Sequence, residues 1–190
     1  MYRKYIKRFL DITLSLLSIL VLSPLFLIIS VIVRIQMGSP ILFKQERIGK
    51  DEKLFDLYKY RSMTNNKDEN GNLLSEKDRI TRFGALLRSS SLDELPELFC
   101  ILKGDMSFVG PRPMPTYYGP YFFPEERKRH SVRGGLIPPD SLSGKTYTTF
   151  EEQFKYEVYY AEHVSFLLDV KVIFTTFKVL FNPVLTRLNY

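Results

Sequence analysis

The sequence predicts a helix-rich α+β fold, in which a hairpin of membrane helices precedes one compact cytoplasmic domain with a few short strands. Three features predict it: an uncharged apolar run at residues 12–33, two short extended segments around a polar turn at 49–52, and apolar residues at helical spacing in much of the remainder. We expect the membrane hairpin in residues 1–36 and the compact domain in residues 37–190, with amphipathic helices at its C-terminal end.

The apolar run carries Ser23 and Pro24 near its middle. A straight helix of this length would reach roughly 33 Å, enough to cross the hydrocarbon core. Proline removes a backbone donor and clashes with the preceding turn, and Ser23 can bond back to a carbonyl, so we expect a sharp bend halfway. A re-entrant helix that enters one leaflet is therefore favoured. The alternatives are a signal anchor that tolerates the proline and a buried core helix.

Basic residues flank this run on both sides. The flanking cations are Arg3, Lys4, Lys7 and Arg8 before it, and Arg34, Lys44, Arg47 and Lys50 after it. Because short flanks rich in Lys and Arg tend to stay in the cytoplasm, both ends of the run are expected on that side, as a re-entrant helix requires. A cleaved signal peptide is disfavoured, because LSPLF offers no small-x-small cleavage site.

Net charge and cysteine content narrow the partners and the compartment. The formal net charge is +6, which suits an anionic membrane surface or a phosphate-bearing substrate. Nucleic acid is the weaker choice, since a chain with a membrane insert has a nearer source of negative charge. The single cysteine, Cys100, excludes an intramolecular disulfide and fits a reducing compartment.

After the insert, the sequence alternates between patterned segments and polar loops. The expected elements are extended segments at 41–49 and 53–63, a helix from about Arg79 to the serines at 89–91, a second helix at 92–103, a charged and initially helical stretch at 124–133, and a helical region from Phe150 onward. Residues 64–77 and 134–144 are expected to be loops. Residues 163–181 have a wide apolar face, so they either lie on the membrane interface or form a core helix.

Two adjacent carboxylates, Asp93 and Glu94, follow a run of three serines. Ser91 and Glu94 have the spacing of a capping box, so capping of a helix that begins here is the simplest interpretation. Neighbouring helical residues point about 100° apart, so one cap does not use both acids, and Asp93 is left for another role. The positive end of a helix dipole keeps such a carboxylate ionised and favours a phosphate beside it, so Asp93 can act as a nucleophile.

An anionic nucleophile that attacks a phosphate needs a divalent cation and nearby basic residues. Arg112 lies between two prolines in a stiff, extended segment, which is typical of a connector as much as of a binding loop. HExxH, P-loop and GxSxG motifs are absent from the sequence, which disfavours zinc hydrolysis, Walker-type ATP binding and serine esterase chemistry. The basic candidates are Lys59, Arg61, Arg88 and Arg112.

Three stretches carry a resemblance to a known family: QERIGKDEKLFDLYKYRSM, TRFGALLRSSSLDELPELFCILKGDMSFVGPRP and SFLLDVKVIF. Together with the Ser23-Pro24 insert, they resemble the small monotopic phosphoglycosyl transferases of the bacterial sugar transferase family over nearly the whole chain. This resemblance implies transfer of a sugar 1-phosphate from a UDP-sugar to undecaprenyl phosphate, with release of UMP. By analogy with the small members, an N-acetylated amino sugar is the expected class.

The resemblance also implies a place and a set of residue roles. It implies the first membrane step of glycoconjugate assembly, at the cytoplasmic face of the bacterial inner membrane, by a monotopic protein that contacts membrane lipids and supplies downstream glycosyltransferases. It assigns Asp93 as the nucleophile and Glu94 as its partner acid, with a required Mg²⁺ held by both. The other functional positions implied by the family are Lys59, Arg88 and Arg112 for substrate, and Ser23 and Pro24 for the bend.

The chain departs from the family pattern at three places. Glu97 and Cys100 stand where the family usually has Gln and commonly Asn, and residues 132–147 differ from the typical VRPGITGWAQVNGR. The identity of the sugar is left open, since this last segment precedes the final helices and is a candidate to contact nucleotide or sugar. Two other functions stay open: a membrane-bound scaffold that binds nucleotide sugar without turnover, and a metal-dependent hydrolase that cleaves UDP-sugars to UMP.

Overall fold

The computed structural model describes residues 1–145 and 148–181 and divides into two compact units. Helices dominate both units and the strands are short, which confirms the predicted helix-rich α+β class. The first unit comprises Met1–Leu14, Glu46–Phe55 and Ile101–Tyr190, and the second comprises Ser15–Gln45 and Asp56–Cys100.

The apolar run forms two helices that meet at a bend. A π-helical turn, Tyr2–Ile6, leads into α1 (Lys7–Val21), and α2 (Ser23–Met37) follows at 63° to it. Pro24 lies in the first turn of α2, and the Ser23 hydroxyl donates a hydrogen bond to the Leu20 carbonyl at 2.8 Å. The bend predicted at Ser23-Pro24 is therefore confirmed. Within the described residues no single helix has the length and apolar composition of a membrane span, whereas this bent pair does when both helices are counted.

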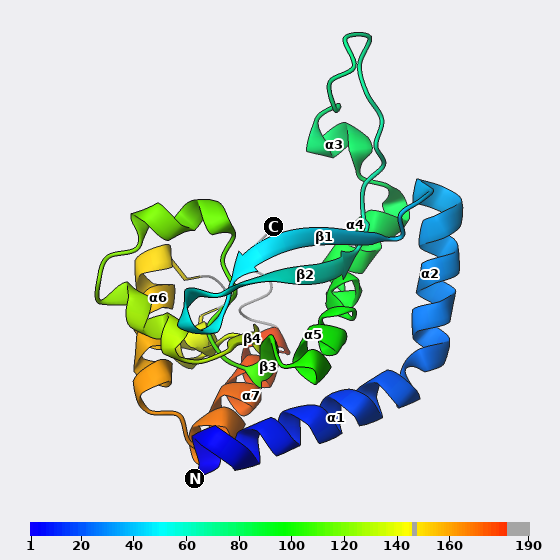
Figure 1. The fold of residues 1–190 in the computed structure, drawn as a ribbon. Coiled ribbons are helices and arrows are strands. Elements are labelled where there is room, and N and C mark those ends of the chain that lie inside the picture. The colour runs from blue at the N-terminus through cyan, green and yellow to red at the C-terminus, as the bar shows by residue number, and fades with distance from the viewer. Residues whose placement is uncertain (146–147, 182–190) are drawn as a thin grey trace. The chain divides into compact units, whose positions relative to one another are not determined.

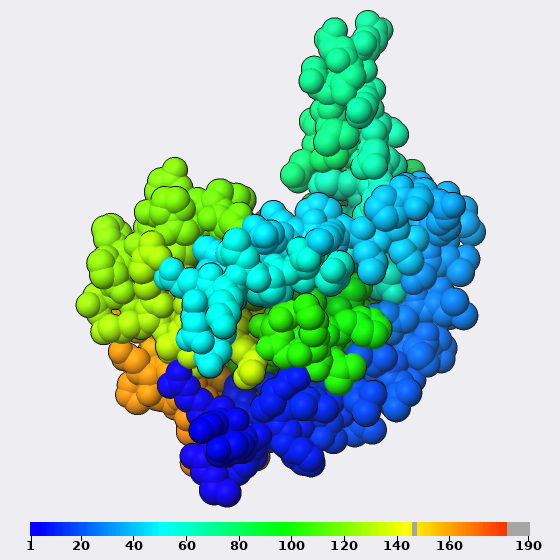
Figure 2. Space-filling view, in the orientation of Figure 1, coloured from blue at the N-terminus to red at the C-terminus, as the bar shows by residue number. Residues whose placement is uncertain are grey.

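Strands β1 (Leu42–Ile48) and β2 (Leu54–Tyr60) form a two-stranded sheet (Figure 1). Gly49 opens the connection, where its backbone N–H donates to the Lys53 carbonyl at 2.9 Å. Beyond β2, residues 64–79 form a largely exposed projection that includes the short helix α3, Glu76–Arg79 (Figure 2). The predicted strand pair is confirmed, and so is the surface loop at 64–77 up to the start of α3.

Two helices flank the serines at 89–91. Helix α4 covers Arg82–Ser89 and α5 covers Glu97–Lys103, and a 3₁₀ turn at Leu92–Glu94 lies between them. Helix α5 ends at Lys103 and is followed by Gly104, whose φ of 105° favours glycine. The predicted pair of helices is confirmed, but the first begins three residues later than expected and the second begins five residues later, at Glu97.

Helix α2 packs one face into the core of the second unit. Ile29, Val33 and Met37 recur every four residues and are buried against Tyr60 of β2 and Leu87 of α4. This face of α2 is therefore part of a protein core, although it belongs to the apolar run. The opposite side of α2 leaves large apolar side chains exposed, among them Leu27, Ile28, Val31 and Ile35.

In the first unit, strands β3 (Met106–Val109) and β4 (Gly134–Ile137) pair in parallel, with Met106 opposite Gly134. The expectation of a loop over residues 134–144 is therefore wrong at its start. A Cβ atom on Gly135 would lie 2.1 Å from the Gly110 nitrogen, so only glycine allows this approach. Glycine, which indicated a loop in the sequence, here allows β4 to pair with β3.

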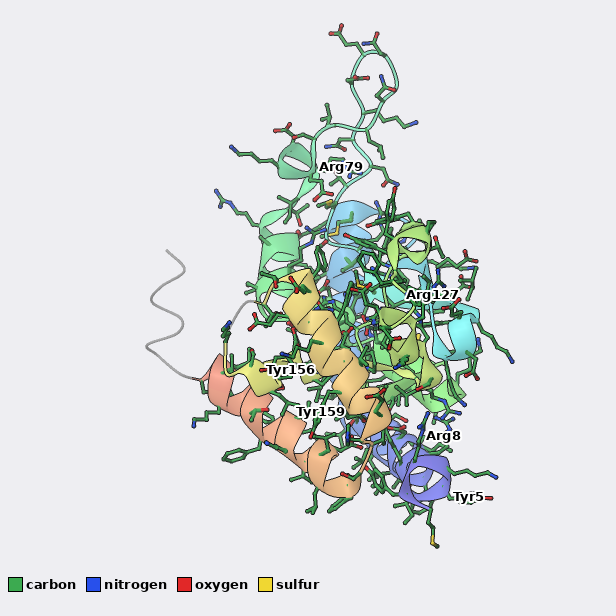
Figure 3. All side chains as sticks on the ribbon, turned by 90° about the vertical axis from the view of Figure 1, so that its left-hand side faces the viewer. Tyr5, Arg8, Arg79, Arg127, Tyr156 and Tyr159 are labelled. Carbon is green, nitrogen blue, oxygen red and sulfur yellow. The ribbon has the colours of Figure 1, made fainter. Side chains whose placement is uncertain are left out.

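Helices α6 (Phe150–Glu162) and α7 (Phe166–Leu180) follow this sheet, with Tyr156 and Tyr159 on α6 (Figure 3). Tyr160 of α6 and Val172 of α7 are buried in one core. Only a narrow face of α7 is buried, which favours the interfacial alternative for residues 163–181. Exposed large apolar residues of α7 include Phe166, Leu167, Val170, Phe174, Phe177 and Leu180.

Candidate functional site

The two predicted catalytic acids lie on a tight turn of the second unit. Asp93 and Glu94 belong to the 3₁₀ turn between α4 and α5. Ser91 precedes the turn in the left-handed conformation, with φ of 55°, and its side chain makes no capping hydrogen bond. The capping-box interpretation of Ser91 and Glu94 is therefore wrong, because the helix itself begins only at Glu97. The acids are presented by a strained turn, not by the first turn of α5.

Lys59 of strand β2 lies close to two carboxylates, that of Glu94 on the 3₁₀ turn and that of Glu97 at the start of α5. Its Nζ lies 2.5 Å from Oε1 of Glu94 and 3.3 Å from Oε1 of Glu97. The side chains of Lys59 and Glu94 are 20% and 24% exposed, whereas that of Glu97 is 5% exposed. A ligand can therefore reach Lys59, while the buried carboxylate of Glu97 pairs with its ammonium group on the protein side. The sequence indicated Glu97 only as a departure from the family pattern.

Burial governs the charge of the nucleophile candidate. Desolvation raises the pKa of Asp93 above its ordinary value, Lys59 opposes this shift, and the adjacent Glu94 adds to it. The position of Asp93 does not favour the expected influence of a helix dipole, since it lies on a three-residue turn, which carries little of the dipole of a full helix. A further cation near Asp93 would favour the ionised form of its carboxylate.

Arg88 lies on the last turn of α4, and a hydrogen bond to the segment after β2 holds its side chain. Its Nε donates to the Ser62 hydroxyl at 2.8 Å, and the side chain is 45% exposed. This contact depends on a close approach of α4, because a Cβ on Gly84 would lie 1.9 Å from the Ser62 carbonyl oxygen. The guanidinium of Arg88 is therefore held at Nε and partly exposed, and its Nη1 lies 3.9 Å from Oε2 of the exposed Glu76.

Arg61 is buried and bonded to backbone. Its Nη1 donates to the Pro40 carbonyl at 2.9 Å and its Nη2 to the Met63 carbonyl at 3.3 Å, and the residue is 7% exposed. Strand β2 ends at Tyr60, so the alternation that would aim Arg61 to the same side as Lys59 stops before it. Its predicted role in substrate binding stays a prediction that these contacts do not favour.

Arg112 lies in the first unit, with an exposed side chain and a clamped backbone. Its N–H donates to Oε1 of Glu157 at 2.7 Å, and its carbonyl accepts from Nη2 of Arg129 at 2.6 Å. Arg129 and Glu157 are themselves paired and almost fully buried. No sequence pattern indicated these contacts, because Arg129 and Glu157 lie far apart in the chain and resemble ordinary surface charges.

Mg²⁺ is the metal ion expected at Asp93 and Glu94, so the ligand atoms that these two side chains offer are compared with those that the ion prefers. No cluster of three or more His, Cys, Asp or Glu side chains that could hold a metal occurs among the described residues. Mg²⁺ is commonly held by one or two carboxylates together with substrate phosphates and water. Asp93 and Glu94 match that donor set, so the residues present fit the ion.

The comparisons with known proteins agree over nearly the whole chain. The "Uncharacterized sugar transferase EpsL" of Bacillus subtilis is 38% identical over 97% of this chain and 92% of its own length. A "UDP-N-acetylgalactosamine-undecaprenyl-phosphate N-acetylgalactosaminephosphotransferase" of Aeromonas hydrophila is 35% identical over 92% of this chain. A "UDP-glucose:undecaprenyl-phosphate glucose-1-phosphate transferase" of Klebsiella pneumoniae is 35% identical over 93% of it.

The lengths of these relatives differ. The chain spans 43% of the Aeromonas protein and 40% of the Klebsiella protein, so it matches less than half of each. Residues 2–183 match the family model described as bacterial sugar transferase. The chain therefore belongs to the bacterial sugar transferase family.

Proposed function

We propose that this chain is an enzyme that transfers a sugar 1-phosphate from a UDP-sugar to undecaprenyl phosphate and releases UMP. The names of the Aeromonas and Klebsiella relatives support the substrate classes. The observation that carries the proposal is the pair of carboxylates on a tight turn, with Lys59 at 2.5 Å from Glu94 and with Arg88 among the charges that act on Asp93. This arrangement suits a charged nucleophile that meets a phosphate.

The first half-reaction begins at Asp93. Its carboxylate oxygen attacks the β-phosphorus of the UDP-sugar, and the bond from that phosphorus to the bridging oxygen breaks, so UMP leaves with the electron pair. Lys59 and Arg88 offset the charge that opposes the attack. Mg²⁺, when held by Asp93 and Glu94, supplies further neutralisation of the diphosphate.

The second half-reaction regenerates the free carboxylate. A phosphate oxygen of undecaprenyl phosphate attacks the same phosphorus and displaces Asp93, which gives undecaprenyl diphosphate sugar. Two successive transfers through one covalent intermediate predict ping-pong kinetics. The sugar is proposed to be an N-acetylated amino sugar, and the Aeromonas relative's name is consistent with that class.

We propose further that the bent α1–α2 pair enters one leaflet from the cytoplasmic face of the bacterial inner membrane and returns. The 63° bend and the exposed apolar side chains on α2 support a re-entrant path. The exposed apolar face of α7 supports a position at the interface. The product would then be available to downstream glycosyltransferases on the same membrane face.

The test is a trapping experiment without acceptor lipid. The purified full chain is incubated with Mg²⁺ and a panel of UDP-sugars labelled in the sugar, and UMP release and label on the protein are measured. We expect about one equivalent of each, and no label for Asp93→Asn. Asp56→Asn, a change on the exposed face of β2, is the matched control and should label like the wild type.

Three results would contradict the transferase. Continued UMP release without lipid would identify a UDP-sugar hydrolase. Nucleotide-sugar binding without any UMP, with or without lipid, would identify a scaffold. Label retained by Asp93→Asn would remove Asp93 as the nucleophile.

A further inference from the structure

A cavity of about 530 Å³ lies in the first unit, beside the N-terminal turn of the chain. The basic N-terminal run at residues 3–7 lines one part of it, and the fold adds Lys50 and Arg133 from distant parts of the sequence. We call it the N-terminal basic pocket. Its basic lining residues are Arg3, Lys4, Lys7, Lys50 and Arg133.

Two of these cations already have close partners. Lys7 forms an ion pair with the buried Asp169 at 2.6 Å. Arg3 donates to the Ser131 carbonyl at 2.8 Å. Both side chains line the pocket. The charge of Lys7 is offset by Asp169, whereas the partner of Arg3 is a backbone carbonyl and carries no charge.

The other three cations are weakly compensated. Lys50 lies 3.6 Å from the exposed Asp51, and pairs of this kind contribute little. Lys4 lies over the Tyr5 ring, with its Nζ 5.3 Å from the ring centre. Arg133 donates through Nε to the Gly104 carbonyl at 2.7 Å, and this bond does not use its two terminal amino groups.

Negative charge in the pocket does not balance them. Asp11 is the one carboxylate that lines it among the described residues, and it is buried. Its Oδ1 accepts from the Ser107 hydroxyl and from the Phe108 N–H, both at 3.0 Å. A second cavity of about 300 Å³ shares Lys50 and Arg133, and it is lined by Asp51 and Asp105 as well. Excess positive charge around a cavity of this size indicates an anionic ligand.

Exposed apolar side chains surround the same part of the chain. Tyr5 and Phe9, which flank Lys7 in sequence, are 61% and 67% exposed, and Tyr5 points outward in Figure 3. Phe166, at the start of α7, stacks edge-on against Tyr2 at 6.0 Å and is also exposed. A basic pocket bordered by apolar side chains matches the boundary between phosphate headgroups and acyl chains.

We propose that the N-terminal basic pocket binds the phosphate of an anionic phospholipid, as a site separate from the acids at 93 and 94. Lys4, Lys50 and Arg133 would contact the phosphate, and the apolar border would contact the first part of the acyl chains. Phosphatidylglycerol has this chemistry: one phosphate diester with net negative charge. The proposal needs the α1–α2 pair to lie at a membrane, but it needs no transfer reaction.

The test measures binding, not turnover. The full chain in neutral detergent micelles is titrated with fluorescent phosphatidylglycerol, and anisotropy gives the Kd. We expect Lys4→Gln/Lys50→Gln to weaken binding on the order of 20-fold, from about fivefold for each cation removed. Lys128→Gln/Lys155→Gln removes the same charge from exposed positions outside the pocket and should change the Kd less than about twofold.

Further arms separate the alternatives. Arg133→Gln, with its fold checked by circular dichroism, should also weaken binding, and Asp93→Asn should bind the lipid like the wild type even though it loses transfer. Equal weakening by the pocket and control variants would overturn the proposal, since general charge would then explain binding. Displacement of the lipid by about 1 mM inorganic phosphate would overturn the lipid source and identify a site for free phosphate. Equal affinity for fluorescent phosphatidylcholine would overturn the anionic requirement.

Discussion

The chain contains two clusters of carboxylate and cation that are built in opposite ways. In the first unit, Arg129 and Glu157 are 1% and 0% exposed, and their hydrogen bonds lead to other protein groups. In the second unit, Lys59 and Glu94 are about a fifth to a quarter exposed beside Asp93. The closed cluster stabilises the fold, whereas the open cluster keeps charge within reach of a ligand. Exposure, more than pairing distance, separates a structural ion pair from a candidate site.

The largest expected effect is on turnover at the open cluster. Asp93→Asn should lower transfer by at least about 10³-fold, because it removes the nucleophile. The same variant should be at least as stable as the wild type, since burial already raises the pKa of Asp93 and disfavours its charge. Activity assays and thermal unfolding in detergent measure the two effects. A variant that lost stability together with activity would show that the open cluster is structural.

The closed cluster should show the reverse. Glu157→Ala should destabilise the fold by about 3–5 kcal/mol, because it leaves Arg129 buried without its partner. Glu152→Ala on the same helix, where the carboxylate is more exposed, should cost less than about 1 kcal/mol. Chemical unfolding of both variants gives the difference. If Glu157→Ala lowered the free energy of unfolding only slightly, the closed cluster would not be the one that stabilises the fold.

A pH dependence of stability is expected beside the closed cluster. Burial and the neighbouring Arg129 lower the pKa of His130 to about 4 in the folded protein, against about 6.5 when unfolded. The unfolded chain therefore binds the proton more readily. Above pH 6.5 His130 leaves the free energy of unfolding unchanged, and as pH falls toward 4 it lowers that free energy by up to about 3 kcal/mol.

Unfolding midpoints measured across that pH range test this expectation. His130→Asn should flatten the decline between pH 6.5 and 4. His163→Asn, which changes the chain's other histidine at an exposed position, should leave the decline as it is in the wild type. An unchanged slope in His130→Asn would assign the decline to carboxylates instead.

The smallest effect is expected from Glu97, which shares features of both clusters. It is buried like Glu157 but pairs with Lys59 of the open cluster. Glu97→Gln should raise the Mg²⁺ concentration for half-maximal transfer about two- to fivefold, because one negative charge near the dyad is lost. Glu69→Gln, on the exposed projection, is the control. A Mg²⁺ requirement unchanged by Glu97→Gln would limit that residue to supporting Lys59.

Local signals made much of this fold predictable. Ser23-Pro24 predicted the bend, and Gly49 with its polar neighbours predicted the turn between β1 and β2, because each acts through its own backbone. The pairing of β4 with β3 was not predictable, since it depends on a close approach of Gly110 and Gly135 from distant parts of the chain.

The site was predictable in its residue types but not in its support. Asp93, Glu94 and Lys59 are neighbours as their chemistry required, and the contact of Glu97 with Lys59 adds a third acid. The left-handed Ser91 and the buried Arg61 were missed, because both follow from where a helix or strand ends. Element boundaries are the part of a structure that sequence patterns define least.

The packing of α2 has a practical consequence for protein engineering. Leu92 and Leu95, on either side of the dyad, pack on the same core as Ile29 and Val33. Deleting the hairpin to obtain a water-soluble fragment would therefore strip one wall from the core beneath the acids. Helix α2 is therefore not a detachable module, and conditions that keep it folded also keep the packing beneath Asp93 and Glu94.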